Sequence, residues 1–145
     1  MANYLFGNFK RTLDDKNRLS LPSKLLPKLS KVLYIMDGHN GVLSIYTEET
    51  FQQKMEDTMK LNREKRIPRE IALAISASSD DIEIDGSNRI RLDNDVIERY
   101  HLKKDVTVVG NFDHLEIWNT EDWEKYYQEI LNRYDENTEE YDYEK

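Results

Sequence analysis

Two short segments of this chain repeat an aspartate and an arginine at the same spacing. The arginine of such a pair can bind a polyanion, or it can pair with the aspartate and stabilise a turn. The segment TLDDKNRLSLP begins at position 12, and EIDGSNRIRLD begins at position 83. Each places an aspartate four residues before an arginine, Asp14 before Arg18 and Asp85 before Arg89, with an asparagine directly before the arginine. An arginine suits bidentate contact with phosphates or guanine edges. It suits an ion pair with the aspartate equally well, so the sequence alone leaves both interpretations open.

The residues between each aspartate and its arginine predict a tight turn between two strands. Asp14 and Asp85 can accept backbone N–H bonds across the turn, as Asx residues do. Asn17 and Asn88 stand where such a turn often requires a positive φ, which asparagine tolerates better than other non-glycine residues. We therefore interpret Asp14, Asp85 and Asn88 as a structural turn motif.

The charge around the two motifs differs in sign. The net charge of −8 argues against a nucleic-acid partner, yet residues 1–34 carry +5 and residues 113–145 carry −9. Around the first turn, residues 8–24 carry +3, whereas residues 79–95 around the second carry −4. This asymmetry indicates a basic working face and an acidic solvated tail. It also predicts that the arginine of the first turn contacts DNA, while that of the second mainly pins its own hairpin.

The repeated turn belongs to a longer internal duplication. The first motif aligns with the second at an offset of 71 positions. The segment LSIYTEETF (43–51) aligns with LEIWNTEDW (115–123) at an offset of 72 positions. Two collinear blocks of matches indicate that the chain contains two copies of one unit. Neither copy is long enough to bury a sufficient apolar core alone. We therefore predict an α+β fold in which the copies share strands in one barrel with pseudo-twofold symmetry.

Each half predicts the same order of elements: strand, loop, strand, short helix, β-hairpin and capped helix. Thr47 can cap the helix after the first hairpin, and Asn119 or Thr120 the helix after the second. Pro68 can begin a helix that connects the halves. The predicted organisation is a first half (8–50), connecting helices (51–78), a second half (79–122), a C-terminal helix (123–134) and an acidic, disordered tail (135–145).

The motifs TLDDKNRLSLP and IEIDGSNRIRL, together with VGNFDHLEIWNTEDW, closely resemble the MraZ family, bacterial transcriptional regulators made of two SpoVT/AbrB-like halves. The resemblance covers residues from about 5 to 134. It implies a double-split, swapped-hairpin β-barrel with flanking helices. It also implies ring-shaped homo-oligomers that bind short direct repeats in double-stranded DNA upstream of the division and cell-wall gene cluster. A cytoplasmic protein associated with the nucleoid follows from that role.

The family's Asp-x-Lys-Gly-Arg signature falls on the first turn and, in part, on the second. Asparagine replaces the usual glycine in both copies, and Asp93 stands where a proline is common, which weakens the second turn as a DNA reader. The resemblance and the local charge together predict DNA contacts from Lys10, Arg11, Lys16, Asn17, Arg18, Arg89 and Arg91.

Catalysis is the first alternative, and the sequence does not favour it. No pair of carboxylates is marked by its spacing, and neither a cysteine nucleophile nor a glycine-rich phosphate loop is present. His39, His101 and His114 stand singly, so we expect no metal site. We also expect no cofactor and no small-molecule substrate. The spacing of the aromatic residues predicts core or subunit packing for Trp118, Trp123, Tyr126 and Tyr127.

The second alternative is an oligomeric scaffold, or an AbrB-like antitoxin, that acts through protein–protein contacts. The overall acidity favours it somewhat, although antitoxins of this kind usually carry one half per chain. The longest apolar runs are far too short to span a bilayer, so no membrane association is expected. The absence of cysteine makes a cytoplasmic protein the default.

Overall fold

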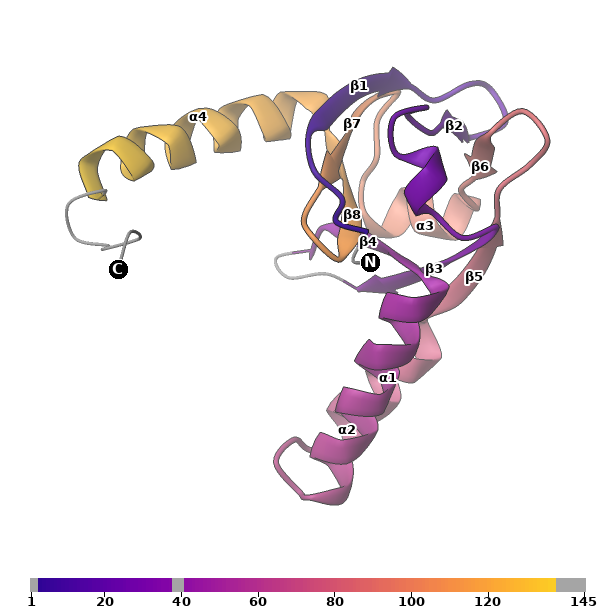
Figure 1. The fold of residues 1–145 in the computed structure, drawn as a ribbon, viewed down its shortest axis with the longest axis vertical. Helices are drawn as coiled ribbons and strands as arrows, with labels where there is room; N and C mark the ends of the chain where they lie inside the picture. Colours follow the sequence, from indigo (N-terminus) through magenta and orange to yellow (C-terminus); the bar gives the residue numbers. More distant parts are fainter. Residues whose placement is uncertain (1–2, 38–40, 138–145) are drawn as a thin grey trace.

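The computed structural model describes residues 3–37 and 41–137. It is a mixed α+β fold with an antiparallel sheet, which confirms the predicted class (Figure 1). The strands are β1 (Asn8–Thr12), β2 (Arg18–Ser20), β3 (Val32–Asp37), β4 (Leu43–Thr47), β5 (Asp80–Glu83), β6 (Arg89–Arg91), β7 (Asp105–Gly110) and β8 (His114–Asn119). The helices are the 3₁₀ turn η1 (Leu26–Lys28), α1 (Glu48–Arg63), α2 (Arg69–Ser78), α3 (Asn94–Arg99) and α4 (Thr120–Asn137).

The strands of the two halves are interleaved rather than separate. The main sheet has the order β1-β7-β8-β4-β3-β5, and β2 pairs with β6 in a two-stranded ribbon. In the main sheet β1 of the first half pairs with β7 of the second, and β5 of the second half pairs with β3 of the first. Neither half therefore completes its sheet alone.

The register of these pairings relates the two halves by a pseudo-twofold axis. Leu19 lies opposite Ile90, which is its equivalent at the offset of 71. Ser44 lies opposite Glu116, its equivalent at the offset of 72. An element that pairs with its own equivalent must lie on the symmetry axis. The ribbon and the centre of the main sheet therefore mark this axis.

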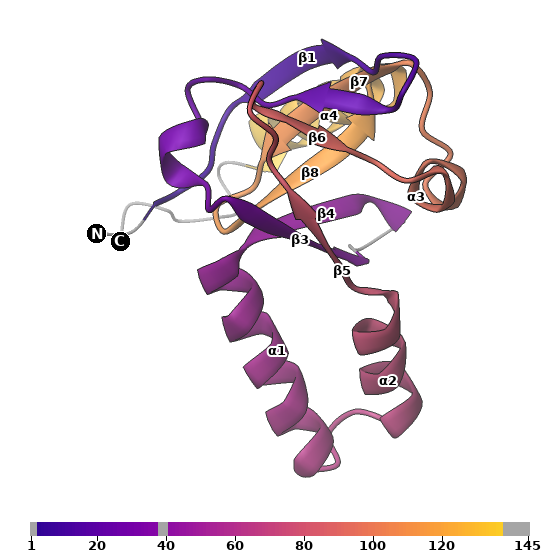
Figure 2. The same cartoon turned by 90° about the vertical axis from the view of Figure 1, so that its right-hand side faces the viewer.

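The core lies between the ribbon and the main sheet. Leu19 and Ile90 on the inner face of the ribbon are fully buried, as are Leu33 and Ile45 on the sheet. Figure 2 shows β2 and β6 above β3 and β5. Because residues alternate between the two faces of a strand, burying Leu19 and Ile90 directs Arg18, Ser20, Arg89 and Arg91 outward.

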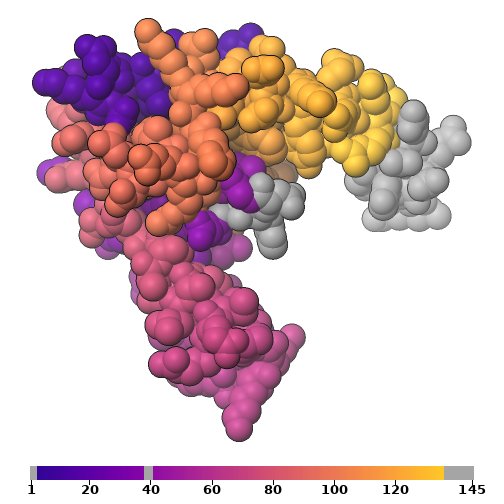
Figure 3. Space-filling view, turned by 180° about the vertical axis from the view of Figure 1, so that it is seen from behind, coloured from indigo at the N-terminus to yellow at the C-terminus, as the bar shows by residue number. Residues whose placement is uncertain are grey.

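Two helical elements project from this body (Figures 1 and 3). The helices α1 and α2 form a hairpin, in which the Thr47 hydroxyl accepts the Thr50 N–H at 3.4 Å and α2 begins directly after Pro68, as predicted. The helix α4 begins at Thr120 and continues to Asn137, three residues into the segment expected to be disordered. Residues 138–145 and the tip of the first hairpin, including His39, lie outside the described residues. No helix in the described part is long and apolar enough to cross a membrane.

His114 lies on the sheet between two carboxylates. Its Nδ1 lies 2.7 Å from Asp113 Oδ1, its Nε2 lies 3.0 Å from Glu116 Oε2, and its ring stacks on Tyr46. Burial lowers the pKa of His114, but the hydrogen bonds to Glu116 and Asp113 outweigh it and raise the pKa above its usual value. The same contact lowers the pKa of Glu116 to about 2.

This cluster predicts a stability that depends on pH. A histidine whose folded-state pKa is raised stabilises the fold fully below the unfolded pKa and loses that contribution as the pH rises through the folded value. Glu116 stays ionised throughout this range because its pKa is lowered. We expect His114→Gln to cost about 1–2 kcal/mol near pH 6 and clearly less near pH 9.

Thermal melts of the wild type and His114→Gln at both pH values test this expectation. Glu116→Gln should remove the larger share of this pH-dependent part, because Glu116 is the stronger of the two carboxylates that favour the charged imidazole, while Asp113 remains. A melting difference that stays constant between the two pH values contradicts the prediction.

Candidate nucleic-acid interface

The first repeated turn is built around the carboxylate of Asp14. Its Oδ1 accepts the backbone N–H groups of Lys16 at 2.9 Å and Arg18 at 2.8 Å. The backbone closes the turn when Asn17 N–H bonds to the Asp14 carbonyl. The second turn repeats these bonds around Asp85. The aspartates therefore shape both turns whatever their arginines contact.

Both asparagines have the left-handed backbone that the sequence predicts. The φ angle is 60° at Asn17 and 61° at Asn88. Their carbonyls then accept N–H bonds from the opposite strand of the ribbon, Asn17 from Leu92 and Asn88 from Leu21. The side chain of Asn17 donates to Asn94 Oδ1 at 2.8 Å. This residue, expected to contact DNA, is thus engaged within the fold.

The pKa values of both aspartates are lowered. The hydrogen bond from the backbone N–H of Arg18 is the largest cause for Asp14, whose pKa falls to about 2 despite partial desolvation. The backbone N–H of Arg89 likewise lowers the pKa of Asp85. Both carboxylates are therefore ionised near neutral pH and can orient a neighbouring guanidinium.

The outer face of the β2–β6 ribbon gathers three arginines. Arg18 lies opposite Arg91, and Ser20 lies opposite Arg89. Residues directly opposite in an antiparallel pair share one face, and like charges placed there are destabilising. Placing Arg18 opposite Arg91 does not stabilise the ribbon, which favours a role for these arginines in binding an anion. A two-stranded ribbon of this kind fits the major groove of B-DNA.

The two motif arginines meet at the symmetry axis and share a carboxylate. Arg18 Nε donates to Asp14 Oδ2 at 2.6 Å. Arg89 lies more loosely, with Nε 3.6 Å from Asp85 Oδ2 and Nη1 3.8 Å from Asp14 Oδ2. Among the described residues, Arg89 Nε is the one buried side-chain polar atom without a hydrogen-bond partner. The two side chains are 33% and 29% exposed.

This geometry does not reproduce the difference in charge that the sequence places around the two arginines. Along the sequence six carboxylates surround Arg89, but Asp80, Asp81 and Glu83 lie on β5. There they line a hollow together with Arg91 and Asp93. The arginine that pairs tightly with an aspartate is Arg18 rather than Arg89. Each arginine lies beside the aspartate of its own turn, so the expected difference in their roles stays a prediction.

The other predicted contacts are divided between two elements. Lys16 is exposed in the first turn, where its N–H binds the same Asp14 oxygen as the N–H of Arg18. Lys10 and Arg11 lie on β1 instead, where Lys10 Nζ pairs with Glu124 Oε1 of α4 at 2.7 Å and Arg11 bonds to the Lys10 carbonyl. The structure therefore brings Lys16, Arg18, Arg89 and Arg91 together but does not join Lys10 and Arg11 to them.

Two lysines beside the first turn are absent from the contacts predicted from sequence. Lys103 and Lys104 line a shallow hollow with Asp14, Asp15 and Asn17, and the Lys104 carbonyl accepts the Leu13 N–H at 2.8 Å. The other half makes the same contact, since the Lys31 carbonyl accepts the Ile84 N–H, but no feature of the sequence marks either one. Only the pairing of the halves brings these residues together.

No group of histidine, cysteine and carboxylate side chains that could hold a metal ion occurs within residues 3–37 and 41–137. His101 is exposed at the end of α3, and His114 is held by Asp113 and Glu116. The ionic cluster of the turns and the ribbon is therefore the candidate site.

Comparison with known families identifies the repeated unit. The sequence model of a family described as "MraZ protein, putative antitoxin-like" matches residues 5–72 and again residues 76–142. This chain belongs to the MraZ family. The boundary between the two MraZ matches lies within α2, the helix that connects the halves.

Several curated MraZ proteins are similar to this chain over most of their length, and they carry the name "Transcriptional regulator MraZ". The protein of Mesoplasma florum is 32% identical over 132 residues, which cover 90% of each chain. That of Corynebacterium kroppenstedtii is 33% identical over 89% of this chain and 90% of its own. That of Corynebacterium urealyticum is 35% identical over 83% and 85%.

Proposed function

We propose that this protein is a sequence-specific, DNA-binding transcriptional regulator of the MraZ type. The observation that carries the proposal is the outer face of the β2–β6 ribbon, where Arg18, Arg89 and Arg91 stand together over a buried apolar layer. The names of the relatives support the regulatory role. DNA recognition accounts for three guanidinium groups on one small face, because the phosphate backbone and guanine edges both accept arginine.

In this proposal the carboxylates orient the arginines rather than neutralise them. Asp14 binds the Nε edge of Arg18, so the terminal nitrogens of that guanidinium remain available to a base or phosphate. Lys16 at the tip of the first turn contacts the backbone of the duplex. Arg91 contributes least, because the carboxylates of β5 beside it repel phosphate. Lys10 and Arg11 lie on β1, outside this contact. Asn17 supports the contact by holding the first turn through its hydrogen bond to Asn94.

We further propose that the ribbon and the main sheet form the swapped-hairpin barrel, and that the protein assembles into a ring on directly repeated boxes. The cross-half pairings β1–β7 and β3–β5 support the swapped barrel. The net charge of −8 supports a requirement for assembly, since one modest basic face is weak in an acidic molecule. A ring repeats that face and gains affinity through multivalency.

An electrophoretic shift with duplex DNA from upstream of the protein's own gene tests the proposal. Specific binding should appear against competitor DNA and weaken with salt, since each phosphate contact contributes about −0.9 to the log–log slope. Retention on heparin that is lost at moderate salt would agree. A folded protein that binds neither this DNA nor heparin at low salt would favour the scaffold or antitoxin alternative.

A further inference from the structure

Three of the most exposed aromatic side chains in the described residues come from two adjoining segments. Tyr4 is 60% exposed, Phe6 is 54% exposed and Phe112, in the turn between β7 and β8, is 71% exposed. The segments are joined by two hydrogen bonds between Leu5 and Phe112, at 2.8 and 2.9 Å. Exposed apolar clusters of this kind mark interaction sites. Tyr4, Phe112 and Lys28 line one hollow, and Lys28 and Lys24 lie over the Phe6 ring, so we call these five residues the aromatic patch.

Phe112 is exposed and has an unfavourable backbone conformation. Its φ is +66°, a left-handed conformation that is uncommon for a bulky residue. It faces Leu5 across the bridge, yet Leu5 is 1% exposed. Asparagine or glycine would adopt this conformation with less strain. An aromatic side chain kept there despite the strain points to a use for its exposure.

The patch is presented by rigid backbone. A Cβ added to Gly110 would lie 2.4 Å from the Phe6 nitrogen and 2.6 Å from the Leu5 carbonyl carbon, so residues 5–6 pack directly on the β7–β8 hairpin. The buried side chain of Leu5 anchors the segment further. A surface that is ordered before binding loses less conformational entropy when a partner docks.

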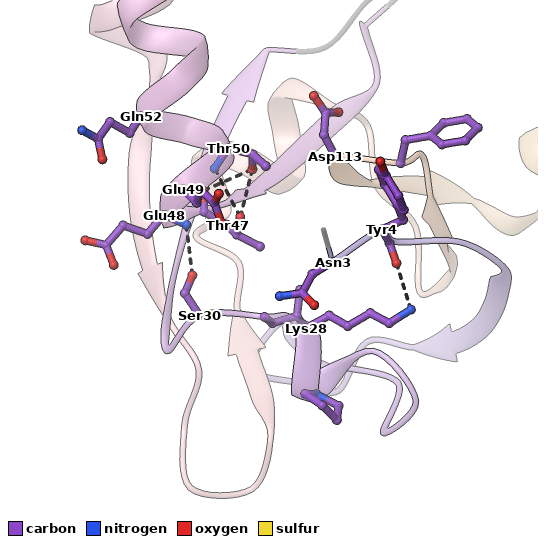
Figure 4. A pocket seen from close by; sticks show the side chains of 13 residues that line it. Asn3, Tyr4, Lys28, Ser30, Thr47, Glu48, Glu49, Thr50, Gln52 and Asp113 are labelled. Atoms are coloured by element: carbon purple, nitrogen blue, oxygen red, sulfur yellow. Dashed lines mark hydrogen bonds between the residues drawn. The ribbon is translucent and has the colours of Figure 1, made fainter. Parts of the chain in front are cut away.

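The charge beside the patch is positive on the side of η1. Lys28 Nζ lies 4.1 Å from the centroid of the Phe6 ring and donates to the Tyr4 carbonyl at 2.9 Å, and Lys24 Nζ lies 5.9 Å from the same centroid. Figure 4 shows Lys28 extending toward Tyr4 beside an open hollow. Glu48 lies on the opposite side of the hollow from Tyr4. Phe112 also lines this hollow, as do Glu49 and Asp113, so the positive charge is confined to the side of Lys24 and Lys28.

The helix α4 offers the complementary surface. Its first turns are fixed to the body by the buried Trp123, by the Thr107–Thr120 contact and by the Lys10–Glu124 ion pair. Figures 1 and 3 show the rest of α4 extending away from the body. Along this part Tyr127 is 37% exposed and Leu131 is 41% exposed, one helical turn apart on the same face. The helix carries six acidic and two basic residues, a net −4.

We propose that the projecting α4 of one copy docks on the aromatic patch of a second copy. This inference rests on the self-association proposed above and names the contact that produces it. The acidic helix meets Lys24 and Lys28, while Tyr127 and Leu131 pack against Phe6 and Phe112. Because helix and patch are different surfaces, each copy donates one contact and accepts another, an arrangement that closes into a ring when the rotation allows.

Charge separates this contact from the main alternative, in which two α4 helices pair with each other. Pairing two helices of net −4 would bring like charges together, which is unfavourable at a helix interface. The segment 21–31 beside the patch contains three lysines and no acidic residue. The attraction between helix and patch therefore favours the head-to-tail contact.

Two single substitutions in the full-length protein test the contact by sedimentation. Phe112→Asn removes the exposed ring and should relax the backbone, so the melting temperature should hold or rise while the assembly dissociates. Leu131→Glu places a charge on the exposed face of α4 at a helix-compatible position and should dissociate the assembly equally. Leu73→Glu, the same kind of change at a residue 52% exposed on α2, is the matched control and should leave the assembly intact.

Mixing the two disabled variants gives the sharpest result. Phe112→Asn retains an intact α4, and Leu131→Glu retains an intact patch, so one productive contact remains between them. An equimolar mixture should form a species of about twice the 17.3 kDa chain mass and nothing larger. Pairing of α4 with α4 predicts instead that Phe112→Asn assembles like the wild type and that the mixture forms no heterodimer.

The outcomes separate this inference from the proposed function. If the wild type assembles and both folded variants assemble equally well, the named contact is wrong while the ring proposal stands. Dissociation by Leu73→Glu alone would assign the contact to the α1–α2 hairpin and overturn the inference. A wild type that stays monomeric at micromolar concentration, with and without DNA, would overturn the ring itself.

Discussion

Arg18→Ala and Arg89→Ala are each expected to abolish specific DNA binding at concentrations that saturate the wild type. A well-placed bidentate arginine contributes about 1–3 kcal/mol to the discrimination of one base pair, which corresponds to roughly tenfold to hundredfold in affinity. In an assembly that uses several ribbons at once, each ribbon loses this contribution. The effect therefore exceeds that of one contact in one chain.

Both variants should keep the fold. The aspartates of the two turns are held mainly by backbone N–H groups, which alanine retains at positions 18 and 89. The arginine side chains are about one-third exposed, and partly exposed ion pairs contribute about 1 kcal/mol or less. Losing Arg89 would also remove the one buried side-chain nitrogen of the described residues that lacks a hydrogen-bond partner. We expect each melting temperature to fall by only a few degrees.

Fluorescence anisotropy with operator DNA, thermal melts and sedimentation of the same samples measure these effects together. Arg91→Ala should weaken binding less than either variant, because the β5 carboxylates beside it already repel the duplex. Arg69→Ala, at the exposed start of α2, is the matched control and should bind like the wild type. If Arg89→Ala binds normally while Arg18→Ala does not, the two turns are unequal, as the charge along the sequence predicts, and the shared role of the two arginines is wrong.

Shifting two operator boxes by half a helical turn is expected to reduce affinity by about a hundredfold or more. The advantage of binding two boxes at once can reach roughly 10²–10⁴-fold, and it is lost when geometry forbids simultaneous contact. An insertion of about five base pairs rotates the second box to the opposite side of the duplex, whereas about ten restore its face. The longer insertion should therefore be the milder one.

Anisotropy titrations on a set of duplexes with inserted base pairs test this spacing rule. A duplex with a single box measures the affinity that remains without multivalency, and the half-turn duplex should approach that value. An assembly-deficient variant such as Phe112→Asn should show little dependence on spacing. Equal affinity of the wild type for all spacings would contradict binding by a rigid ring.

The local chemistry of the turns could be predicted from the sequence. Hydrogen bonds from an aspartate to the next few N–H groups, and the positive φ of Asn17 and Asn88, depend on residues adjacent in the chain. The same holds for the cap at Thr47 and for the helix start after Pro68. The duplication was visible because both copies retain these local requirements.

The grouping of the arginines was decided by the tertiary structure. Arg18 and Arg91 are 73 positions apart, and they share a face because β2 pairs with β6 in one particular register. A shift of that register by one residue would exchange the inner and outer faces, and local sequence does not specify which strand of the other half is the partner. Most of the carboxylates near Arg89 in the sequence therefore line a hollow with Arg91 instead.

Local sequence likewise could not predict which basic residues lie near the first turn and which lie near the projecting helix α4. Counting charge along the chain placed Lys10 with the first turn, whereas β1 carries it to the base of α4 and to Glu124. It also overlooked Lys104, which the pairing of the halves brings beside Asp14. By itself the sequence determined the turns, the helices and the duplication, because their interactions are local. Only the tertiary structure decided which charges share a face, because strand pairing joins residues that are far apart in the chain.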